Sequence, residues 1–447
     1  AGELYEYSGI KGLRQQGFQE TDMVAMAKPI TKYAVQIRKP EDIVEELNKA
    51  YHIATTGRRG PVLIDLPMNI QRSEVENPVY DMTFEDKHTD TDAAQQAADT
   101  ILEALEQAKR PVIMLGHGVD SSFSQQKLIR FAQKRQIPII TSVLAKSVLG
   151  YDHPLNFGCI GGAYGHRYAN MIANAKSDLL LCFGISLCTR QIGTKVHEFA
   201  RGAKIIRIDI DPYNLQRDIH ENGINEVKLQ AETGAVIDCL AKAAAPDTEG
   251  ISDWLNICTE IKENLQAVDD ATPERYPNRM IADLSDMLED TSAIAVDVGQ
   301  HMVWSYQSFK NHEGQKLLFS GGHGAMGYGL PAAIGAYYAT GKPTACICGD
   351  GALQMNIQEL EWVKRENLPV KIMVMNNEAL GMIRHLQRDY FDCLFAGTTD
   401  GCGFASCNFA EVAKAYGIPA LRMLCDAVRE EAPEFLEGEG PKLLEVM

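Results

Sequence analysis

The sequence predicts an α/β protein made of three domains, each built on a doubly wound parallel sheet. Short apolar runs that end on glycine or polar turns alternate with helical stretches, which is typical of parallel strands joined by right-handed crossovers. The chain has 447 residues, about three times the usual domain length. Two polar stretches without periodicity, 79–93 and 244–252, separate the predicted domains 1–78, 94–243 and 253–447.

Composition narrows the class of protein. Apolar residues make up 45% of the chain, enough to fill large cores, and the formal net charge of −17 argues against nucleic acid or an anionic membrane surface as a partner. No run of about 18 apolar residues exists, so no transmembrane helix is expected. The 11 cysteines are odd in number and several lie in apolar strands, which indicates reduced thiols in a cytoplasmic protein.

The first predicted domain contains one helix pattern and one strand pattern. Apolar residues recur at helical spacing over 41–56, and an apolar run over 60–67 predicts a buried strand that stops at a proline. The chain begins at Ala1 rather than at a methionine, and its last residues, 442–447, form a predicted strand. We therefore expect the sequence to be part of a longer polypeptide.

The second predicted domain alternates helices and strands. Helices are expected over 95–108 and 123–135, and strands over 111–115, 138–142, 178–183 and 204–210. A glycine loop, Gly116-His117-Gly118, follows the first of these strands. Such a loop could cradle a nucleotide phosphate, although a lone short glycine loop is a weak signal.

The third predicted domain contains the stretch that indicates chemistry. After a helix over 276–289 and a strand over 293–297, a strand over 343–350, a helix over 355–366 and a strand over 369–375 are expected. Asp350 ends one of these strands and Asn377 follows the other. Because carboxyl ends of neighbouring parallel strands share one crevice, four segments should meet at the same edge of the sheet, namely 299–301, 324–328, 350–352 and 377–382.

The residue types at this edge suit a divalent cation and a bulky anion. A carboxylate and an amide oxygen match Mg²⁺, which takes its remaining oxygens from a phosphate ligand, water and backbone carbonyls. Gly349 and Gly351 lack a Cβ, so an anion can approach the backbone closely. Gly-Asp-Gly alone is more often an ordinary turn, but Asn376-Asn377 following it after 24 residues is a far more specific pattern.

This pattern resembles the signature of thiamine-diphosphate enzymes. One segment, Val298-Gly299-Gln300-His301-Met302, is similar to the diphosphate-contacting segment of acetolactate (acetohydroxyacid) synthases. Residues 321–335 and 381–383 are similar to two other segments of that family. Residues 18–22, 29–32 and 60–67 resemble the end of its pyrimidine-binding domain. The likeness covers nearly the whole chain.

The resemblance implies a role for each predicted domain and for individual residues. Residues 1–78 would be the C-terminal part of the pyrimidine-binding domain, 94–243 a central domain of FAD type or a vestige of one, and 253–447 the diphosphate-binding domain. The implied Mg²⁺ ligands are Asp350, Asn377 and the backbone carbonyl of Ala379. The implied cofactor contacts are Gly299, Gln300, His301, Gly324, Met326, Gly349, Asp350, Gly351, Ala352, Asn377, Gly381 and Met382.

The resemblance also implies catalytic and substrate-binding residues. Met326 matches the bulky residue under the bend of the cofactor, and Gln19 and Phe18 match residues near the reacting centre. Lys32 and Arg190 match positions near the substrate channel. The glutamate that hydrogen-bonds the aminopyrimidine ring is expected in the part of the pyrimidine-binding domain that this sequence lacks.

Simpler interpretations of the same side chains stay open. Methionine fills irregular gaps in ordinary cores, so Met326 alone would be ascribed to packing. Gln300 and His301 could be surface polar residues that follow a strand. Lysine and arginine are mostly solvated, which applies to Lys32 and Arg190.

Further features of the family match only in part. Its central domain binds a non-redox FAD, but here Cys188-Thr189 stands before Arg190 where the family has an acidic pair, so FAD is an open possibility. Family members place the active site between two chains, which implies a homodimer or homotetramer. The sequence identifies no regulatory subunit.

The function that the resemblance implies is that of a thiamine-diphosphate- and Mg²⁺-dependent carboligase. It would decarboxylate pyruvate or another 2-keto acid and condense the product with a second carbonyl compound. Leu386 stands where relatives that prefer 2-ketobutyrate carry tryptophan, which argues against branched-chain amino-acid biosynthesis proper.

Other functions remain as alternatives. They are another thiamine-diphosphate-dependent 2-keto acid decarboxylase, an acyl-CoA lyase of the same fold, and a non-catalytic or inactive fragment without the glutamate. A nicotinamide dehydrogenase is disfavoured because no convincing G-x-G-x-x-G follows a predicted strand.

Overall fold

The computed structural model describes residues 21–76, 90–119, 121–244 and 251–447, which fall into two compact units. The first unit comprises the described residues up to Asp90 together with Ile210–Pro212, and the second comprises the remainder. Gln19 and Phe18 lie outside the described residues. Among the described helices, none combines the length and the hydrophobicity needed to cross a bilayer.

The first unit contains a short parallel sheet. Strands β1 (Tyr33–Gln36) and β2 (Val62–Asp65) pair with Tyr33 opposite Val62, and α2 (Ile43–Thr55) connects them. Two shorter helices, α1 (Met23–Ala27) and α3 (Met68–Gln71), complete the described elements. The predicted helix and strand of this region are confirmed, whereas β1 was not predicted.

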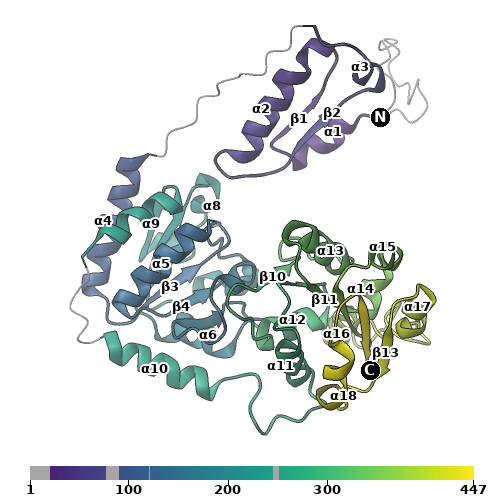
Figure 1. Ribbon diagram of the computed structural model, residues 1–447. Coiled ribbons are helices and arrows are strands. Elements are labelled where there is room, and N and C mark those ends of the chain that lie inside the picture. The colour runs from purple at the N-terminus through teal and green to yellow at the C-terminus, as the bar shows by residue number, and fades with distance from the viewer. Residues whose placement is uncertain (1–20, 77–89, 120, 245–250) are drawn as a thin grey trace. The chain divides into compact units, whose positions relative to one another are not determined.

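The second unit contains two six-stranded parallel sheets, which confirms the predicted fold class (Figure 1). The first has the strand order β5-β4-β3-β6-β7-β8. Its strands are β3 (Pro111–Leu115), β4 (Ile139–Thr141), β5 (Asn156–Cys159), β6 (Leu179–Phe183), β7 (Lys204–Asp209) and β8 (Glu226–Gln230). Every residue of β3 and β6 is buried, because helices cover both faces of a parallel sheet and central strands are therefore apolar throughout.

Helices flank this first sheet. They are α4 (Thr91–Gln107), α5 (Ser122–Arg135), α6 (Arg167–Met171), α7 (Thr189–Ile192), α8 (Pro212–Gln216), α9 (Thr233–Lys242) and α10 (Ile251–Asn264). The last of them packs on the core of this sheet, since Trp254 is buried there and donates a hydrogen bond from its indole nitrogen to the carbonyl oxygen of Pro111 at 3.0 Å.

The second sheet has the strand order β10-β9-β11-β12-β14-β13. Its strands are β9 (Ala293–Val296), β10 (Lys316–Phe319), β11 (Thr344–Gly349), β12 (Val370–Met375), β13 (Ala420–Met423) and β14 (Lys442–Val446). Its helices are α11 (Pro277–Met287), α12 (Gln300–Ser308), α13 (Gly329–Thr340), α14 (Asp350–Gln354), α15 (Glu359–Arg365), α16 (Gly381–Tyr390), α17 (Phe409–Ala415) and α18 (Val428–Leu436).

The direction in which successive strands are added reverses within this second sheet. The chain runs from β9 outward to β10 and then returns to place β11 on the other side of β9, so the topological switch point lies between β9 and β11. A crevice forms at such a point outside the carboxyl ends of the strands, and ligands of open α/β sheets bind there. The segments that follow β9, β11 and β12 begin at this edge.

The predicted helix over 355–366 was wrong in its bounds. The structure instead has the short helix α14 directly after β11, then turns, then α15 from Glu359. Asn356 sits in the interruption and donates a side-chain hydrogen bond to the carbonyl oxygen of Gly327. Asparagine competes with helix hydrogen bonding through such contacts, and here the contact ties α14 to the loop that precedes α13.

Candidate functional site

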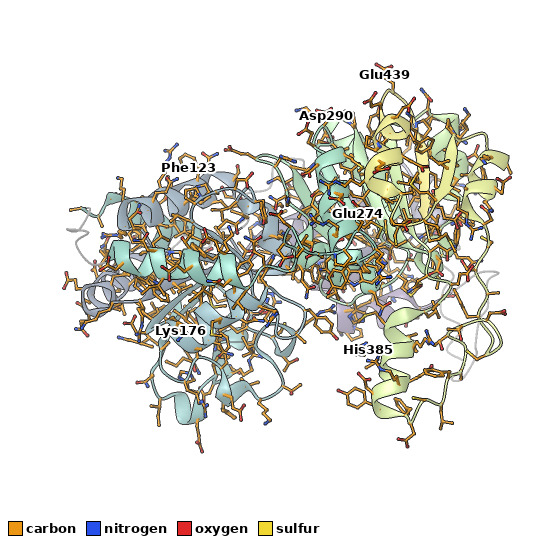
Figure 2. The ribbon with its side chains drawn as sticks, turned by 90° about the horizontal axis from the view of Figure 1, so that it is seen from below. Phe123, Lys176, Glu274, Asp290, His385 and Glu439 are labelled. Carbon is orange, nitrogen blue, oxygen red and sulfur yellow. The ribbon has the colours of Figure 1, made fainter. Side chains whose placement is uncertain are left out.

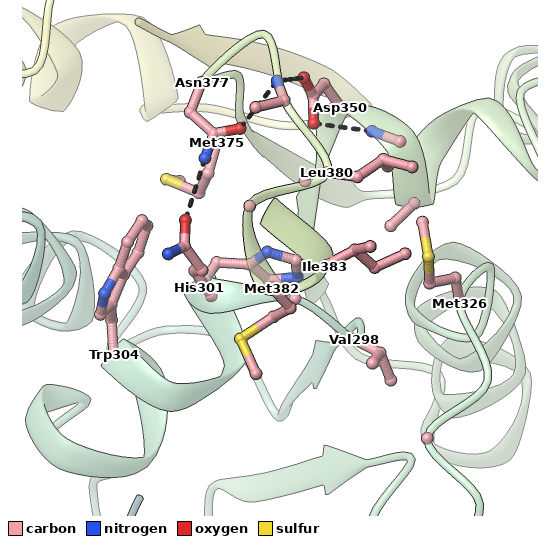
Figure 3. A pocket seen from close by; sticks show the side chains of 18 residues that line it. Val298, His301, Trp304, Met326, Asp350, Met375, Asn377, Leu380, Met382 and Ile383 are labelled. Carbon is pink, nitrogen blue, oxygen red and sulfur yellow. Dashed lines mark hydrogen bonds between the residues drawn. The ribbon is translucent and has the colours of Figure 1, made fainter. Parts of the chain in front are cut away.

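A cavity of about 260 Å³ opens at the carboxyl edge of the second sheet (Figure 3). The loops after β9, β11 and β12 line it, together with the loop before α13. All 12 residues predicted as cofactor contacts are among its 18 lining residues, as is Ala379. Five further lining residues, all with apolar side chains, were not predicted as cofactor contacts: Val298, Trp304, Met375, Leu380 and Ile383.

Two side-chain oxygens converge at the top of this cavity. Asp350 is 3% exposed, and its Oδ2 accepts a hydrogen bond from the backbone nitrogen of Ala379 at 3.1 Å. The Oδ1 of Asn377 accepts from the same nitrogen at 3.2 Å. Because both oxygens reach one amide, the carboxylate after β11 and the amide after β12 lie on the same side of the sheet, as the sequence predicts.

The electrostatics of Asp350 favour a cation beside it. Burial raises the pKa of its carboxyl group, and hydrogen bonds from the backbone nitrogens of Gly351, at 2.8 Å, and Ala379 oppose that shift. No lysine or arginine from the described part of the chain lines the cavity. A carboxylate that is buried without a cationic partner is unfavourable, so binding of a divalent ion there would be stabilising.

Two glycines of the cavity lie close to side chains of neighbouring segments. A Cβ at Gly351 would lie 2.5 Å from Cδ2 of Leu380, and one at Gly381 would lie 2.1 Å from Oε1 of Gln300. Real Cβ atoms do not approach other atoms so closely, so a larger residue at either position would require the Leu380 or Gln300 side chain to move. The Cε of Met326 is 3.3 Å from the same Cβ position of Gly351, which places the methionine tip at the start of α14.

Two polar side chains enter the cavity from the first turn of α12. Gln300 accepts a hydrogen bond at Oε1 from Nδ2 of Asn377 at 3.1 Å, which links this helix to the loop after β12. His301 is 4% exposed, and its Nε2 has no hydrogen-bond partner among the described residues. Burial lowers the pKa of His301 to about 4, so the ring is neutral at neutral pH. The His301 ring (Figure 3) therefore carries a buried nitrogen without a hydrogen-bond partner among the described residues.

Asp297, which the sequence analysis did not single out, holds the loop before α13. Its Oδ1 accepts hydrogen bonds from the backbone nitrogens of Val298 at 2.7 Å and Gly327 at 3.0 Å, and its Oδ2 accepts from that of Gly329 at 2.6 Å. Gly324 and Met326 reach the cavity on the loop that is fixed in this way. The signal in the sequence was an acidic residue at the end of an apolar strand.

The two asparagines after β12 differ in role. Asn376 is buried and donates from Nδ2 to Oε1 of Glu445 at 2.6 Å, while its Oδ1 accepts from the backbone nitrogen of Glu378 at 3.0 Å. It therefore shapes the turn that presents Asn377. From the sequence alone the pair could be recognised as a unit, but not divided into a structural and a cavity residue.

The two residues that were predicted near the substrate channel are described each within its own unit. Lys32, in the first unit, donates to the backbone oxygens of Ile53 and Thr56 at the end of α2. Arg190, in the first turn of α7, is exposed and its guanidinium lies 5.1 Å from the ring centre of Tyr164. The proximity of these two residues to substrate stays a prediction.

The backbone amides of the glycine loop after β3 are bonded to carbonyl groups of the same chain. The backbone nitrogen of Gly116 donates to the carbonyl oxygen of Phe183, and that of Gly118 to that of Gly184, both at 2.9 Å. A Cβ at Gly116 would lie 2.0 Å from the oxygen of Gly184. These two amides are thus engaged by the loop after β6 and are not free to bind a phosphate.

Comparisons with known proteins agree with the geometry. The family described as "Thiamine pyrophosphate enzyme, C-terminal TPP binding domain" matches residues 297–446, and "Thiamine pyrophosphate enzyme, central domain" matches 98–240. The chain is 34% identical to a "Probable acetolactate synthase large subunit" of Methanocaldococcus jannaschii, over 98% of this chain and 75% of the relative. It is 32% identical to the "Acetolactate synthase isozyme 1 large subunit" of Escherichia coli, over 96% of this chain and 74% of the relative.

Proposed function

Because the chain belongs to the acetolactate synthase large-subunit family of thiamine-diphosphate enzymes, we propose that it is a Mg²⁺-dependent carboligase for 2-keto acids. It would decarboxylate pyruvate or a similar acid and join the remaining fragment to a second carbonyl compound. The observation that carries this proposal is the convergence of the Asp350 carboxylate and the Asn377 amide oxygen on the nitrogen of Ala379.

The residues present fit a magnesium ion with a diphosphate. Asp350, Asn377 and the carbonyl of Ala379 would hold the metal through oxygen atoms, which Mg²⁺ prefers. The unpartnered Nε2 of His301 offers a donor for a diphosphate oxygen when that nitrogen carries the proton of the neutral ring. The first residues of α12 and α16 also line the cavity, and helix N-termini favour anions.

When bound, thiamine diphosphate would supply the electron sink for decarboxylation. The chain's own residues would orient the cofactor and keep water away from it. Met326 would support the bend of the cofactor from the start of α14, where its Cε already lies. Val298, Leu380 and Ile383 give the cavity an apolar wall. Gln300, which is bonded to Asn377, would couple the position of α12 to that of the metal site.

A second copy of the chain is proposed to complete the active site. None of the residues of α16 is buried, and its apolar side chains Ile383, Leu386 and Tyr390 are 46%, 48% and 76% exposed. Figure 2 shows this helix, marked by His385, extending from the body of its domain. An apolar surface next to a cofactor cavity supports a homodimer or homotetramer in which another subunit covers it.

Binding tests this proposal without requiring turnover. We expect Mg²⁺ with thiamine diphosphate to raise the melting temperature, because a ligand that binds only the folded state stabilises it, and either component alone to do so less. Asp350→Ala should abolish the Mg²⁺-dependent rise in melting temperature. Asp290→Ala, at an exposed site labelled in Figure 2, should retain that rise. A full Mg²⁺-dependent shift in Asp350→Ala would refute the metal assignment.

Product analysis separates the related activities. A carboligase converts pyruvate to CO₂ and a condensed hydroxyketo acid, a decarboxylase releases the free aldehyde, and an acyl-CoA lyase requires a CoA thioester. We propose that Gln19 and Phe18 lie at the reacting centre, and the assay uses a polypeptide that also includes the glutamate implied by the family resemblance. Lys32→Ala and Arg190→Ala would test the proposed proximity of these residues to substrate through a raised KM.

FAD in the central domain is tested separately. The amides of Gly116 and Gly118 are already bonded to backbone carbonyls, so this loop does not fit a flavin diphosphate through those two groups. We derive no step from FAD. Visible flavin absorbance that stays with the protein through gel filtration would establish FAD as a ligand held by other residues.

A further inference from the structure

A second cavity lies between α5 and α9 on the first six-stranded sheet. It has a volume of about 260 Å³ and is lined by four cationic side chains and by apolar groups that include Phe131 and Leu240. The two helices pack against each other and contribute to the apolar core of that sheet (Figure 1). It shares no residue with the cavity at the edge of the second sheet.

The four cations are Lys127, Arg130, Lys134 and Arg135, and they differ in whether a carboxylate pairs with them. Lys127 forms an ion pair with Asp238, with Nζ and Oδ1 2.7 Å apart. The side chains of Arg130 and Lys134 are exposed, and neither makes a hydrogen bond or an ion pair with any residue in the described part of the chain. Most of the positive charge in this cavity therefore lacks a carboxylate partner among the described residues, in a chain whose net charge is −17.

Arg135 is the most informative of the four. Its residue is 6% exposed, and its guanidinium lies 4.6 Å from the ring centre of Phe131 and donates to the carbonyl oxygen of Ala244 at 2.8 Å. Burial lowers its pKa, and no carboxylate of the described residues pairs with it. Buried charges in proteins are normally paired, because removing a charge from water is unfavourable. A buried guanidinium at the wall of a cavity is therefore suited to an anion that enters from solvent.

The helix dipole explains only part of this arrangement. Cations in the last turn of a helix are favoured by its dipole, which accounts for Lys134 and Arg135 at the end of α5. It does not account for Arg130, one turn earlier, nor for the concave shape or the apolar lining. The residues Arg130 and Lys134 are four apart and thus lie on the same face of the helix, directed at one site.

We propose that the cavity between α5 and α9 binds a small organic phosphate, whose phosphoryl group lies against Arg130, Lys134 and Arg135 and whose carbon body lies against the accessible side chains of Ala241 and Ala243. Two or more negative charges match the cations that lack a partner, and guanidinium groups bind phosphate oxygens through paired hydrogen bonds. The volume of about 260 Å³ restricts the body to a few carbon atoms. This site is independent of the proposed carboligase activity.

The test measures binding of 3-phosphoglycerate and glycerol 3-phosphate by calorimetry, with the protein saturated by Mg²⁺ and thiamine diphosphate so that the first cavity is occupied. We expect saturable binding that weakens severalfold between about 0.05 M and about 0.3 M salt. Arg130→Ala/Lys134→Ala, which changes exposed residues, should weaken binding about tenfold or more. Arg130→Lys/Lys134→Arg should restore most of it, because the charges are retained.

A matched control lies on another helix. Lys364 and Arg365 are two exposed cations in the last turn of α15, and Lys364→Ala/Arg365→Ala should bind the phosphates as the parent protein does. Equal weakening in both double variants would reduce the effect to net charge and overturn the proposal. So would the absence of saturable binding, or binding of sulfate as tight as that of the organic phosphates. None of these outcomes depends on carboligase turnover.

Discussion

Asp297 provides a quantitative test of how the first cavity is built. The substitution Asp297→Ala removes an acceptor that serves three backbone N–H groups, those of Val298, Gly327 and Gly329. A buried donor left without a partner costs about 1–3 kcal/mol, and the bond to Gly329 is fully buried while the other two are partly buried and can be rehydrated.

Two terms set the magnitude of this effect. Burial raises the pKa of the Asp297 carboxyl group, which shows that desolvation of the charge offsets part of what the three bonds contribute. We therefore expect a net local destabilisation of about 3 kcal/mol in Asp297→Ala. Asp297→Asn keeps one oxygen and can retain the two bonds that Oδ1 now accepts, so its loss should be about 1–2 kcal/mol.

Hydrogen exchange is the appropriate assay because the effect is local. Exchange of the amides in 324–333 should accelerate in the order wild type, Asp297→Asn, Asp297→Ala, while amides of β6 in the other sheet stay protected. Asp290→Ala changes an exposed carboxylate and serves as the control. Thiamine-diphosphate affinity should fall in the same order, because Gly324 and Met326 lie on the loosened loop. Equal exchange in Asp297→Ala and Asp290→Ala would refute the reasoning.

Three further predictions concern other buried or perturbed groups. Arg207 and Glu226 form a pair whose side chains are 2% and 0% exposed, so Arg207→Met should destabilise the protein to urea by about 3–5 kcal/mol, and adding Glu226→Leu should recover part of that. The depressed pKa of His301, about 4, means that its contribution to stability is present above pH 6.5 and is lost as the pH falls towards 4. His301→Asn should flatten the unfolding free energy over that window by up to roughly 3 kcal/mol. Hydrogen bonds, chiefly from Thr399, lower the pKa of Cys402 to about 7, so the rate of its alkylation by iodoacetamide should reach half its plateau near that pH and vanish in Cys402→Ser.

The position of the cavity could be predicted from sequence because it follows from topology. Parallel strands that are buried on both faces are continuous apolar runs, and their carboxyl ends must share an edge. Asp350 and Asn377 end two such runs, so their meeting at one amide required no knowledge of side-chain packing. The predicted and observed bounds of the strands β11 and β12 differ by at most one residue at each end.

Elements at the margins of the sheets were missed for the opposite reason. The edge strands β5, β8, β10 and β13 are short and contain polar or charged residues, as in Glu226–Gln230, so they lack the apolar run that identifies central strands. Missing β10 had a consequence. Residues 322–327 form a G-x-G-x-x-G sequence, and the structure places them after that strand and before α13. Two amides of this region, those of Gly327 and Gly329, are bonded to Asp297 instead of being free for a phosphate.

Side-chain networks could not be predicted from the sequence because they join residues far apart in the chain. Asn376 is paired with Glu445, 69 positions later, and no periodicity encodes that contact. The same limit applies to the apolar lining of the cavity, where Leu380 and Met326 meet over Gly351. Sequence patterns identify which residues end strands, whereas the contacts made by those residues depend on which loops the fold brings opposite them.

The glycine loop after β3 allows a structural and a ligand-binding role to be separated by experiment. A Cβ at Gly116 would lie 2.0 Å from the backbone oxygen and 2.5 Å from the carbonyl carbon of Gly184, and backbone cannot move aside as a flexible side chain can. Gly116→Ala should therefore destabilise the protein by at least about 3 kcal/mol, at the upper end of overpacking effects. Gly202→Ala, in the same sheet domain with nothing within 4 Å of its Cβ position, should be close to neutral in urea denaturation. If Gly116→Ala were as stable as Gly202→Ala, close packing of the two loops would not be the reason for glycine at this position, and a ligand that approaches the backbone there would become the better explanation.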